Sequence, residues 1–405
     1  MKCPDFGPLY KQIDKDLEVH RAHPMTKERM AYTSQQYGSA RARALTLGVI
    51  NGTAYLLRPV NWRDLSHHAW LLLSYVRMVR YMQDTFGRDL PDVAFAITTN
   101  DGPKHPHVPL KINPVAQREF PAQVAAAGEV PRDYKGPFPV FGYCKTDYHA
   151  DTILVPNFHF HMRKYSETYL KHIPDFNQRP WSEREPKLFG RFSHYKLIRG
   201  GSGNLFVNKL GVNGTQICDR LNKSCPSRDE FIRFARLHKD MMDVHFSGMR
   251  PMSVHARYKY LVNLEGQALS SRMEVLLPLG SLVFKERSGY YAYYYHLLKH
   301  RENVMMFWDS NGGPEDILQE LAWAKEHDDE AAAIAARGQQ LAAKYLSSEA
   351  RVCYWYRLLH EYAKTFSYRV DLSQWPGAVT LDEVLDRIVV KELGVNPLKP
   401  PKWGP

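Results

Sequence analysis

Residues 258–284, YKYLVNLEGQALSSRMEVLLPLGSLVF, carry the pattern that decides the fold of this chain. Their first nine residues predict a strand and a turn, residues 270–280 predict a helix that stops at its final glycine, and residues 281–285 predict the next strand. Ser271 and Glu274 fit the S-x-x-E capping box, which predicts that the helix begins at Ser271. The stretch therefore indicates one strand–helix–strand unit of an α/β fold.

The turn between this strand and this helix carries groups suited to an anion. The N–H groups of a first helical turn lack partners within the helix and attract negative charge. Arg272 follows the predicted cap, and its guanidinium can fork onto two phosphate oxygens. Ser270 and Ser271 offer hydroxyl groups, and Gly266 allows the backbone to approach a ligand closely. Because neither a G-x-G-x-x-G nor a Walker pattern is present, an ordinary helix cap with a surface arginine is the alternative interpretation.

The same alternation of helix and strand extends through the first half of the chain. Residues 62–85 show a helical spacing of apolar residues, and residues 93–97 form a short apolar run typical of a strand buried on both faces. Two further runs of this kind follow at 139–144 and 152–156. We therefore expect α/β layers with a mainly parallel sheet.

Helices dominate the last third of the chain. Pro314 is suited to a first helical position, and the helix predicted after it leads into an Ala-rich helix at 330–346. A last, aromatic helix is predicted from Val352, and the tail from Pro397 is expected to be extended or disordered. The tyrosine-rich run 290–298 is interpreted as helical.

Length and composition fit a globular protein of two domains. A chain of 405 residues exceeds the usual limit of a single core, and its hydrophobic content of 44% and charged content of 24% are ordinary. Residues 157–190 are rich in charge, proline and aromatic side chains and lack periodicity, so they mark the domain boundary. We expect one domain at 1–185 and another at 186–354, with the last helices, about 355–405, packing back on the first.

The net charge of +11 favours anionic partners, among them nucleic acid, acidic glycans and nucleoside diphosphates. The basic residues are spread along the chain and not gathered into one tract, which argues against a nucleic-acid-binding protein. No stretch approaches the roughly 20 consecutive apolar residues that a membrane-spanning helix needs. We therefore expect no transmembrane segment in this chain.

Two motifs contain side chains that could bind a metal ion. His159 and His161 alternate as in a strand, but no third ligand stands nearby, so structural roles are the preferred interpretation. Asp14-Lys15-Asp16 is a D-x-D by its letters only, because it does not follow a buried strand. We expect neither a metal nor another cofactor.

The opening stretch resembles the conserved core of the CAP10-like family 90 glycosyltransferases, the group that contains the Rumi-type protein O-glucosyltransferases and several xylosyltransferases. The similarity continues through GSLVF, WAKEHDDEAAAIAARGQQLA and VCYWYRLLHEYA, and it covers most of residues 90–365. The resemblance implies a GT-B fold of two Rossmann-like domains facing a central cleft. The first domain would hold the acceptor and the catalytic base, and the second would bind a UDP-sugar.

The resemblance also implies roles for individual residues. Arg272 with Ser270 corresponds to the family's diphosphate-binding pair, and Asp101, in TTNDGPKHP, corresponds to its catalytic base. A carboxylate in that place takes the proton of the acceptor hydroxyl as it attacks the anomeric carbon. Arg272 would stabilise the charge that the leaving diphosphate gains. By the residues alone, Asn-Asp-Gly-Pro is also ordinary turn chemistry, so a turn role for Asp101 is the alternative.

The segment KLFGRFSHYKLIRGG (187–201) resembles the family's glycine-arginine-serine stretch, which opens the nucleotide half. Its order is Gly-Arg-Phe-Ser and departs from the commoner form. The arginine that contacts phosphate is therefore either Arg191 or Arg199, and Ser193 is a further candidate.

The segment FGYCKTDYHADTILVP resembles the family's Ser-Lys-Thr and Asp-Ile stretch near the cleft. Lys145, Thr146 and Asp151 are accordingly candidates for lining that cleft. A capping role for Asp151 at the following strand is the alternative.

The cysteines and sequons bear on location. Cys353 matches a family cysteine that pairs with one near the N-terminus, for which Cys3 is the candidate here, and Cys218 and Cys225 are close enough to bridge a small loop. Three N-x-S/T sequons begin at Asn51, Asn213 and Asn222. The resemblance, the sequons and these pairings together predict the lumen of the ER or Golgi, with a leader or anchor absent from this chain. We also expect a monomer.

The sequence thus predicts an inverting glycosyltransferase that moves xylose or glucose from a UDP-sugar to a hydroxyl of a glycan or protein. One CH₂OH group distinguishes the two donors, and nothing in the sequence decides between them. The alternative is a catalytically inactive glycan- or UDP-sugar-binding module on the same fold.

Overall fold

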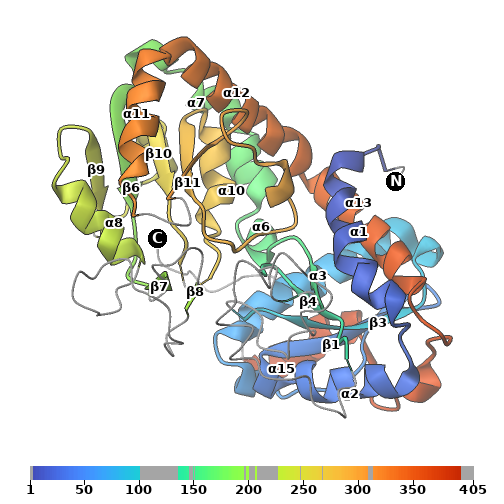
Figure 1. Cartoon of the computed structure of the whole chain (residues 1–405). Helices are drawn as coiled ribbons and strands as arrows, with labels where there is room; N and C mark the ends of the chain where they lie inside the picture. Colours follow the sequence, from blue (N-terminus) through green and yellow to red (C-terminus); the bar gives the residue numbers. More distant parts are fainter. Residues whose placement is uncertain are drawn as a thin grey trace. The chain divides into compact units, whose positions relative to one another are not determined.

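The computed structural model describes residues 3–100, 136–145, 149, 151–195, 198–199, 206–207, 227–246, 248–266, 268–308 and 313–393 (Figure 1). These residues form two compact units. The first unit contains the described residues up to 164 and those from 348 onward, and the second contains those between 165 and 347. The sequence had placed these divisions at 185 and 354.

The divisions differ because buried polar side chains tie the boundary segments to their own unit. The Tyr165 hydroxyl donates to the Glu274 carbonyl at 2.7 Å, and Arg184 donates to acceptors in residues 279–281, so both belong to the second unit. The Tyr354 hydroxyl donates to the last residue of a first-unit strand at 3.0 Å. The closing helices therefore belong to the first unit from residue 348.

The first unit contains a six-stranded mixed sheet. Its strands lie in the order β13 (Val379–Thr380), β2 (Thr53–Leu56), β1 (Ala44–Ile50), β3 (Val93–Thr98), β4 (Val140–Gly142) and β5 (Thr152–Leu154). The last three are the strands predicted from apolar runs, and they pair in parallel. The other pairings are antiparallel. The β1–β2 hairpin was not predicted, although its turn is Asn51-Gly52, a favoured hairpin dipeptide with φ of 50° and 76°.

Four long helices belong to this unit: α1 (Gly7–Ala22), α2 (Lys27–Tyr37), α3 (His68–Phe86) and α13 (Ser348–Ala363). α3 is the helix predicted at 62–85, preceded by a 3₁₀ turn and ended by Gly87. α13 begins four residues before the predicted Val352 and buries one face, including Trp355 and Tyr362. The Tyr362 hydroxyl donates to the Ala94 carbonyl of β3 at 3.1 Å, which fixes α13 on the sheet.

A disulfide joins Cys3 to Cys353, with 5.5 Å between the two Cα atoms. This confirms the pairing that the family resemblance implied. It links the residues before α1 to α13, which α1 contacts. Cys218 and Cys225, the other predicted pair, lie outside the described residues, as does the tail from Pro397.

Buried charged groups join α1 to the end of the sheet. Lys145 forms an ion pair with Asp16 of α1 and donates to the Thr152 carbonyl at 2.7 Å. The other oxygen of the Asp16 carboxylate accepts the Leu154 N–H at 2.8 Å. Nearby, burial raises the pKa of the Asp151 carboxyl to about 8. The candidate residues Lys145 and Asp151 are therefore part of the interior of the first unit, at 2% and 0% exposure.

The second unit contains a five-stranded sheet in which every pairing is parallel. Its strands lie in the order β12 (Met305–Phe307), β11 (Leu282–Glu286), β10 (Tyr258–Asn263), β6 (Glu185–Arg191) and β9 (Met242–His245). β10, α10 (Arg272–Leu276) and β11 form the predicted strand–helix–strand unit, which confirms that prediction. Gly280, with φ of 68°, stops the helical segment as expected.

Helices flank this sheet (Figure 1). They are α7 (Ile173–Phe176), α8 (Ser227–Arg236), α9 (Met252–His255), α11 (Asp316–Glu326) and α12 (Asp328–Tyr345). α11 and α12 were predicted, but α11 begins at Asp316, two residues after Pro314. The reason is that the Asp316 carboxylate accepts the Trp308 N–H at 2.8 Å and so anchors the first turn at that residue.

Two predictions of local structure were wrong. In place of the helix predicted at 290–298, the structure has the 3₁₀ turn η8 (Tyr295–Leu297). Tyr293 and Tyr294 are both fully buried, and neighbouring residues of one helix point in different directions. His159 and His161 lie on the short helix α6 (Phe158–Met162) and not on a strand. Burial lowers the pKa of His159 well below its ordinary value. Within the described ranges, no helix combines the length and apolar character that crossing a membrane requires.

The disulfide should stabilise the first unit. The substitution Cys3→Ser is expected to lower its free energy of unfolding by about 2–5 kcal/mol, since the bridge closes a very long loop of the unfolded chain. Urea unfolding of the two proteins without reductant measures the difference. Equal unfolding midpoints would contradict the stabilising role of this bridge.

The buried Asp151 carboxyl should make stability depend on pH. Its folded pKa of about 8 lies above the unfolded value, so the folded state retains a proton that the unfolded state releases, and stability falls as pH rises from about 4 to 8. The substitution Asp151→Asn removes this contribution. The stability gained by the variant should grow by about 1.4 kcal/mol per pH unit between pH 5 and 7. Urea unfolding at both pH values tests this, and a difference that does not change with pH would contradict it.

Candidate functional site

The second sheet has a topological switch point between β6 and β10. Along the chain the sheet begins at β6, adds β9 on one side, and then adds β10, β11 and β12 on the other side. The connections after β6 and after β10 therefore leave in opposite directions. In open parallel sheets this divergence leaves a crevice at the carboxyl ends of the two strands, where ligands bind. The segments after β6 and β10 are the two that the sequence singled out.

The loop after β10 is organised around the buried carboxylate of Glu265. One oxygen accepts the N–H of Ser270, and the other lies 3.2 Å from Lys285 Nζ and accepts the Ser288 hydroxyl at 3.1 Å. Glu286 accepts the Glu265 N–H at 2.9 Å. Burial raises the pKa of Glu265, and the Lys285 charge opposes that rise. The loop therefore encloses its own fully buried acid, which fixes the position of Ser270.

Arg228 joins the two strand ends and was not identified from the sequence. It lies on α8, is 5% exposed, and donates to the carbonyl oxygens of Ser193, Leu264 and Glu265 at 2.9, 3.0 and 2.7 Å. Burial lowers its pKa to about 10. An arginine in the first turn of a charged helix gives no sequence signal of burial. Its role becomes visible only when the carbonyl groups from two different loops are seen to converge on it.

Arg272 is the first residue of α10, as predicted. Ser271 is the N-cap residue, but its side chain makes no capping hydrogen bond, so the predicted capping box is not formed. Instead the Ser270 hydroxyl accepts the Arg272 N–H at 3.4 Å. The Arg272 guanidinium lies 5.2 Å from the Phe192 ring centroid, which places it against the segment after β6.

Arg191, the last residue of β6, lies in the same region. Burial, together with the charges of Arg272 and Arg191, lowers the pKa of His255 to about 4, so both guanidiniums act on one histidine. Arg191 itself is bound to Asp243, at 2.8 Å from one carboxylate oxygen and 2.9 Å from the other. Its positive charge is therefore largely balanced within the protein.

Other predicted residues are described to different extents. Ser193 is exposed just after β6, and its carbonyl is held by Arg228. Arg199 lies on the short strand β7 (Ile198–Arg199), paired with β8 (Phe206–Val207). Asp101 and Thr146 lie outside the described residues.

Gly266 could carry a Cβ atom without a clash. A Cβ atom at this position would lie 3.5 Å from Arg228 Nη2 and 3.6 Å from the Tyr195 ring, both ordinary contact distances. The fold therefore does not require a glycine here. Gly190 on β6 is different, because a Cβ there would lie 2.6 Å from the Val262 side chain.

Comparisons with known proteins identify the family of this chain. Residues 1–388 match the family model described as Glycosyl transferase family 90. Protein O-glucosyltransferase 2 of Danio rerio is 26% identical over 385 residues, which is 90% of this chain and 63% of the relative. Protein O-glucosyltransferase 3 of Mus musculus is 38% identical over 108 residues, which is 27% of this chain and 21% of the relative. Protein O-glucosyltransferase 1 of Homo sapiens is 29% identical over 191 residues, which is 43% of this chain and 47% of the relative.

This chain spans less than two thirds of the length of each of these relatives. The family model, by contrast, covers nearly all of the chain. The family resemblance of residues 258–284 and the segments after them is thereby confirmed, and the chain belongs to glycosyl transferase family 90.

Proposed function

We propose that the chain is an inverting, metal-independent glycosyltransferase that moves xylose or glucose from a UDP-sugar to a hydroxyl group of a protein or glycan. The observation that carries this proposal is the position of Arg272 and Ser270 directly after β10, at the switch point of a parallel sheet, in a chain of family 90. The names of the relatives specify protein O-glucosylation, which favours glucose and a protein hydroxyl.

The diphosphate of the donor would bind at the ends of β6 and β10. A guanidinium can donate two parallel hydrogen bonds to phosphate oxygens, and Arg272 lies where the two segments meet. Positive charge at this point stabilises the leaving UDP as the sugar is transferred, which is the task that a metal ion performs in other transferases. The proposal therefore needs no metal.

Asp101 would act as the general base, as the family resemblance implies. Removal of the acceptor proton by a carboxylate while the hydroxyl attacks the anomeric carbon gives a single displacement, and a single displacement inverts that carbon. The proposal includes the GT-B arrangement, with the acceptor and the base held by the first unit and the donor by the second.

The proposal places the chain in the ER or Golgi lumen as a monomer. The Cys3–Cys353 disulfide supports this location, because such bridges form and persist in oxidising compartments.

Release of UDP tests the function directly. With UDP-xylose and UDP-glucose as separate donors, one donor should be hydrolysed at a rate that EDTA does not change. The substitution Arg272→Ala should weaken UDP binding by about tenfold to a hundredfold, the range for a lost charged hydrogen-bonding group. Asp101→Asn should keep UDP affinity and lower the rate of transfer by about a hundredfold or more. Calorimetry with UDP and an assay of sugar transfer measure these effects.

Three results would count against the proposal. Loss of UDP release in EDTA would exclude metal independence, and a normal transfer rate for Asp101→Asn would exclude this base. If both donors bind but neither is hydrolysed or transferred, the chain is the inactive binding module.

Gly266 offers a second test, because the protein leaves room for a methyl group there. Gly266→Ala should leave the melting temperature unchanged and weaken UDP affinity by about fivefold or more, since the added Cβ occupies space that the diphosphate needs. Gly190→Ala is the matched control. It should destabilise the protein by about 1–3 kcal/mol, because its Cβ would overlap Val262.

Thermal melting and UDP calorimetry on both variants separate the two effects. If Gly266→Ala binds UDP as tightly as the parent protein, the diphosphate does not approach this loop.

A further inference from the structure

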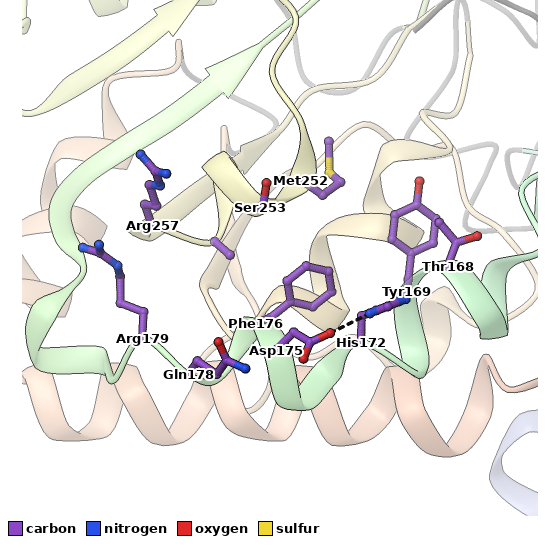
Figure 2. Close-up of a pocket in the computed structure, with 11 residues that line it drawn as sticks. Thr168, Tyr169, His172, Asp175, Phe176, Gln178, Arg179, Met252, Ser253 and Arg257 are labelled. Carbon is purple, nitrogen blue, oxygen red and sulfur yellow. Dashed lines mark hydrogen bonds and ion pairs between the residues drawn. The ribbon is translucent and has the colours of Figure 1, made fainter.

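A cavity in the second unit is lined by residues other than the candidate phosphate-binding ones. Its volume is about 580 Å³, and it lies between the segment of η5 (Ser166–Leu170) and α7 on one side and α9 on the other (Figure 2). Arg257 lies immediately before β10, and Arg179 lies before β6. The cavity is thus at the amino ends of the two strands whose carboxyl ends carry Arg272 and Arg191.

The charge of this cavity is positive. Arg179 and Arg257 line it, and among the residues that the structure describes neither forms an ion pair with a carboxylate. Arg179 donates to the Glu183 carbonyl at 3.1 Å. The acid of the cavity, Asp175, is paired with His172, whose Nδ1 lies 2.6 Å from one carboxylate oxygen. Among the described lining residues, two guanidiniums therefore stand against one carboxylate, which leaves a net positive charge for an anion from outside.

The rest of the lining suits a sugar ring. Figure 2 shows Arg179 and Arg257 at one end, Tyr169 and Thr168 at the other, and the Phe176 ring between them. The C–H face of a pyranose packs well against an aromatic ring of this kind, which is rigid and only partly buried. Thr168 supplies a hydroxyl group that can exchange hydrogen bonds with sugar hydroxyls. The cavity therefore combines an apolar platform, polar groups and a cationic end.

We propose that this cavity binds a sugar residue that carries a carboxylate, a uronic acid within an acidic glycan. The carboxylate would lie between Arg179 and Arg257, because a guanidinium can donate two parallel hydrogen bonds to a carboxylate. The ring would pack against Phe176. This site is independent of the donor site and of catalysis, and it gives the chain a preference for glycans of negative charge.

Calorimetry on the full chain, with an oligosaccharide that contains glucuronic acid as the ligand, tests the proposal. The same oligosaccharide with its carboxyl groups reduced to alcohols is the matched ligand, and it should bind about tenfold or more weakly, because it cannot pair with the arginines. Arg257→Gln and Arg179→Gln should each reduce the affinity for the acidic form by about tenfold. Phe176→Leu should weaken the binding of both the acidic and the reduced oligosaccharide. None of these changes should alter the affinity for UDP.

Arg236→Gln is the control variant. Arg236 is an exposed arginine on α8 outside the cavity, so its replacement removes the same charge from the same unit. The affinity of the Arg236→Gln variant for the acidic oligosaccharide should stay within about twofold of the parent value, because salt screens an exposed charge outside the cavity. A loss equal to that of Arg257→Gln would show a general charge effect and overturn the proposal.

Two further outcomes would also overturn it. Equal binding of the reduced and acidic oligosaccharides, measured on the unaltered protein, would exclude recognition of the carboxylate. If inorganic phosphate or a glutamate-rich peptide bound as tightly as the acidic glycan, with the same dependence on Arg257, the cavity would be an anion site and not a sugar site. Because UDP binding is measured separately, failure here leaves the proposed transferase function untouched.

Discussion

The candidate donor site depends on one buried carboxylate, that of Glu265. Burial of a charged group costs several kcal/mol unless hydrogen bonds and an opposite charge compensate it. Here Lys285, Ser288 and the Ser270 N–H all converge on the Glu265 carboxylate, which is fully buried. These contacts can form together only if the loop after β10 closes over the acid. The conformation of that loop is thus set by the need to compensate the buried charge of Glu265. Because the loop leads into α10, its conformation also sets the position of Arg272.

Arg228 extends the same constraint to the neighbouring strand. A guanidinium has five N–H donors on three nitrogen atoms held in a rigid plane, whereas the three donors of a lysine share one nitrogen. Arg228 uses this geometry on Ser193 after β6 and on Leu264 and Glu265 after β10. The two strand ends at the switch point are therefore joined by one side chain. A ligand at this point meets a preorganised edge rather than two independent loops.

The sequence predicted those parts of the fold that follow from local patterns. Apolar runs gave β3, β10 and β11, and helical spacing gave α3 and α12, because the burial of each element is written in its own residues. β6 was missed: its first two residues are exposed, and only its later residues enter the core. The tyrosines of 290–298 were misassigned because they pack into the core from irregular backbone. Arg228 escaped because its carbonyl partners lie 35 to 37 residues away along the chain. Glu265 escaped because Lys285 and Ser288, 20 and 23 residues after it, meet it only once β11 lies beside β10.

The structure also bears on which group would hold the diphosphate. α10 has only five residues, and the Ser270 hydroxyl already accepts the Arg272 N–H, so the helix terminus offers less to an anion than the sequence suggested. The partial charge at a helix end comes from aligned peptide groups that have no other partner. A charged side chain must then supply most of the attraction. Arg191 is balanced by both oxygens of Asp243, and Arg228 is occupied by three carbonyl groups. Arg272, only partly buried and lying against Phe192 at the start of α10, is the guanidinium that the proposed function assigns to the phosphate.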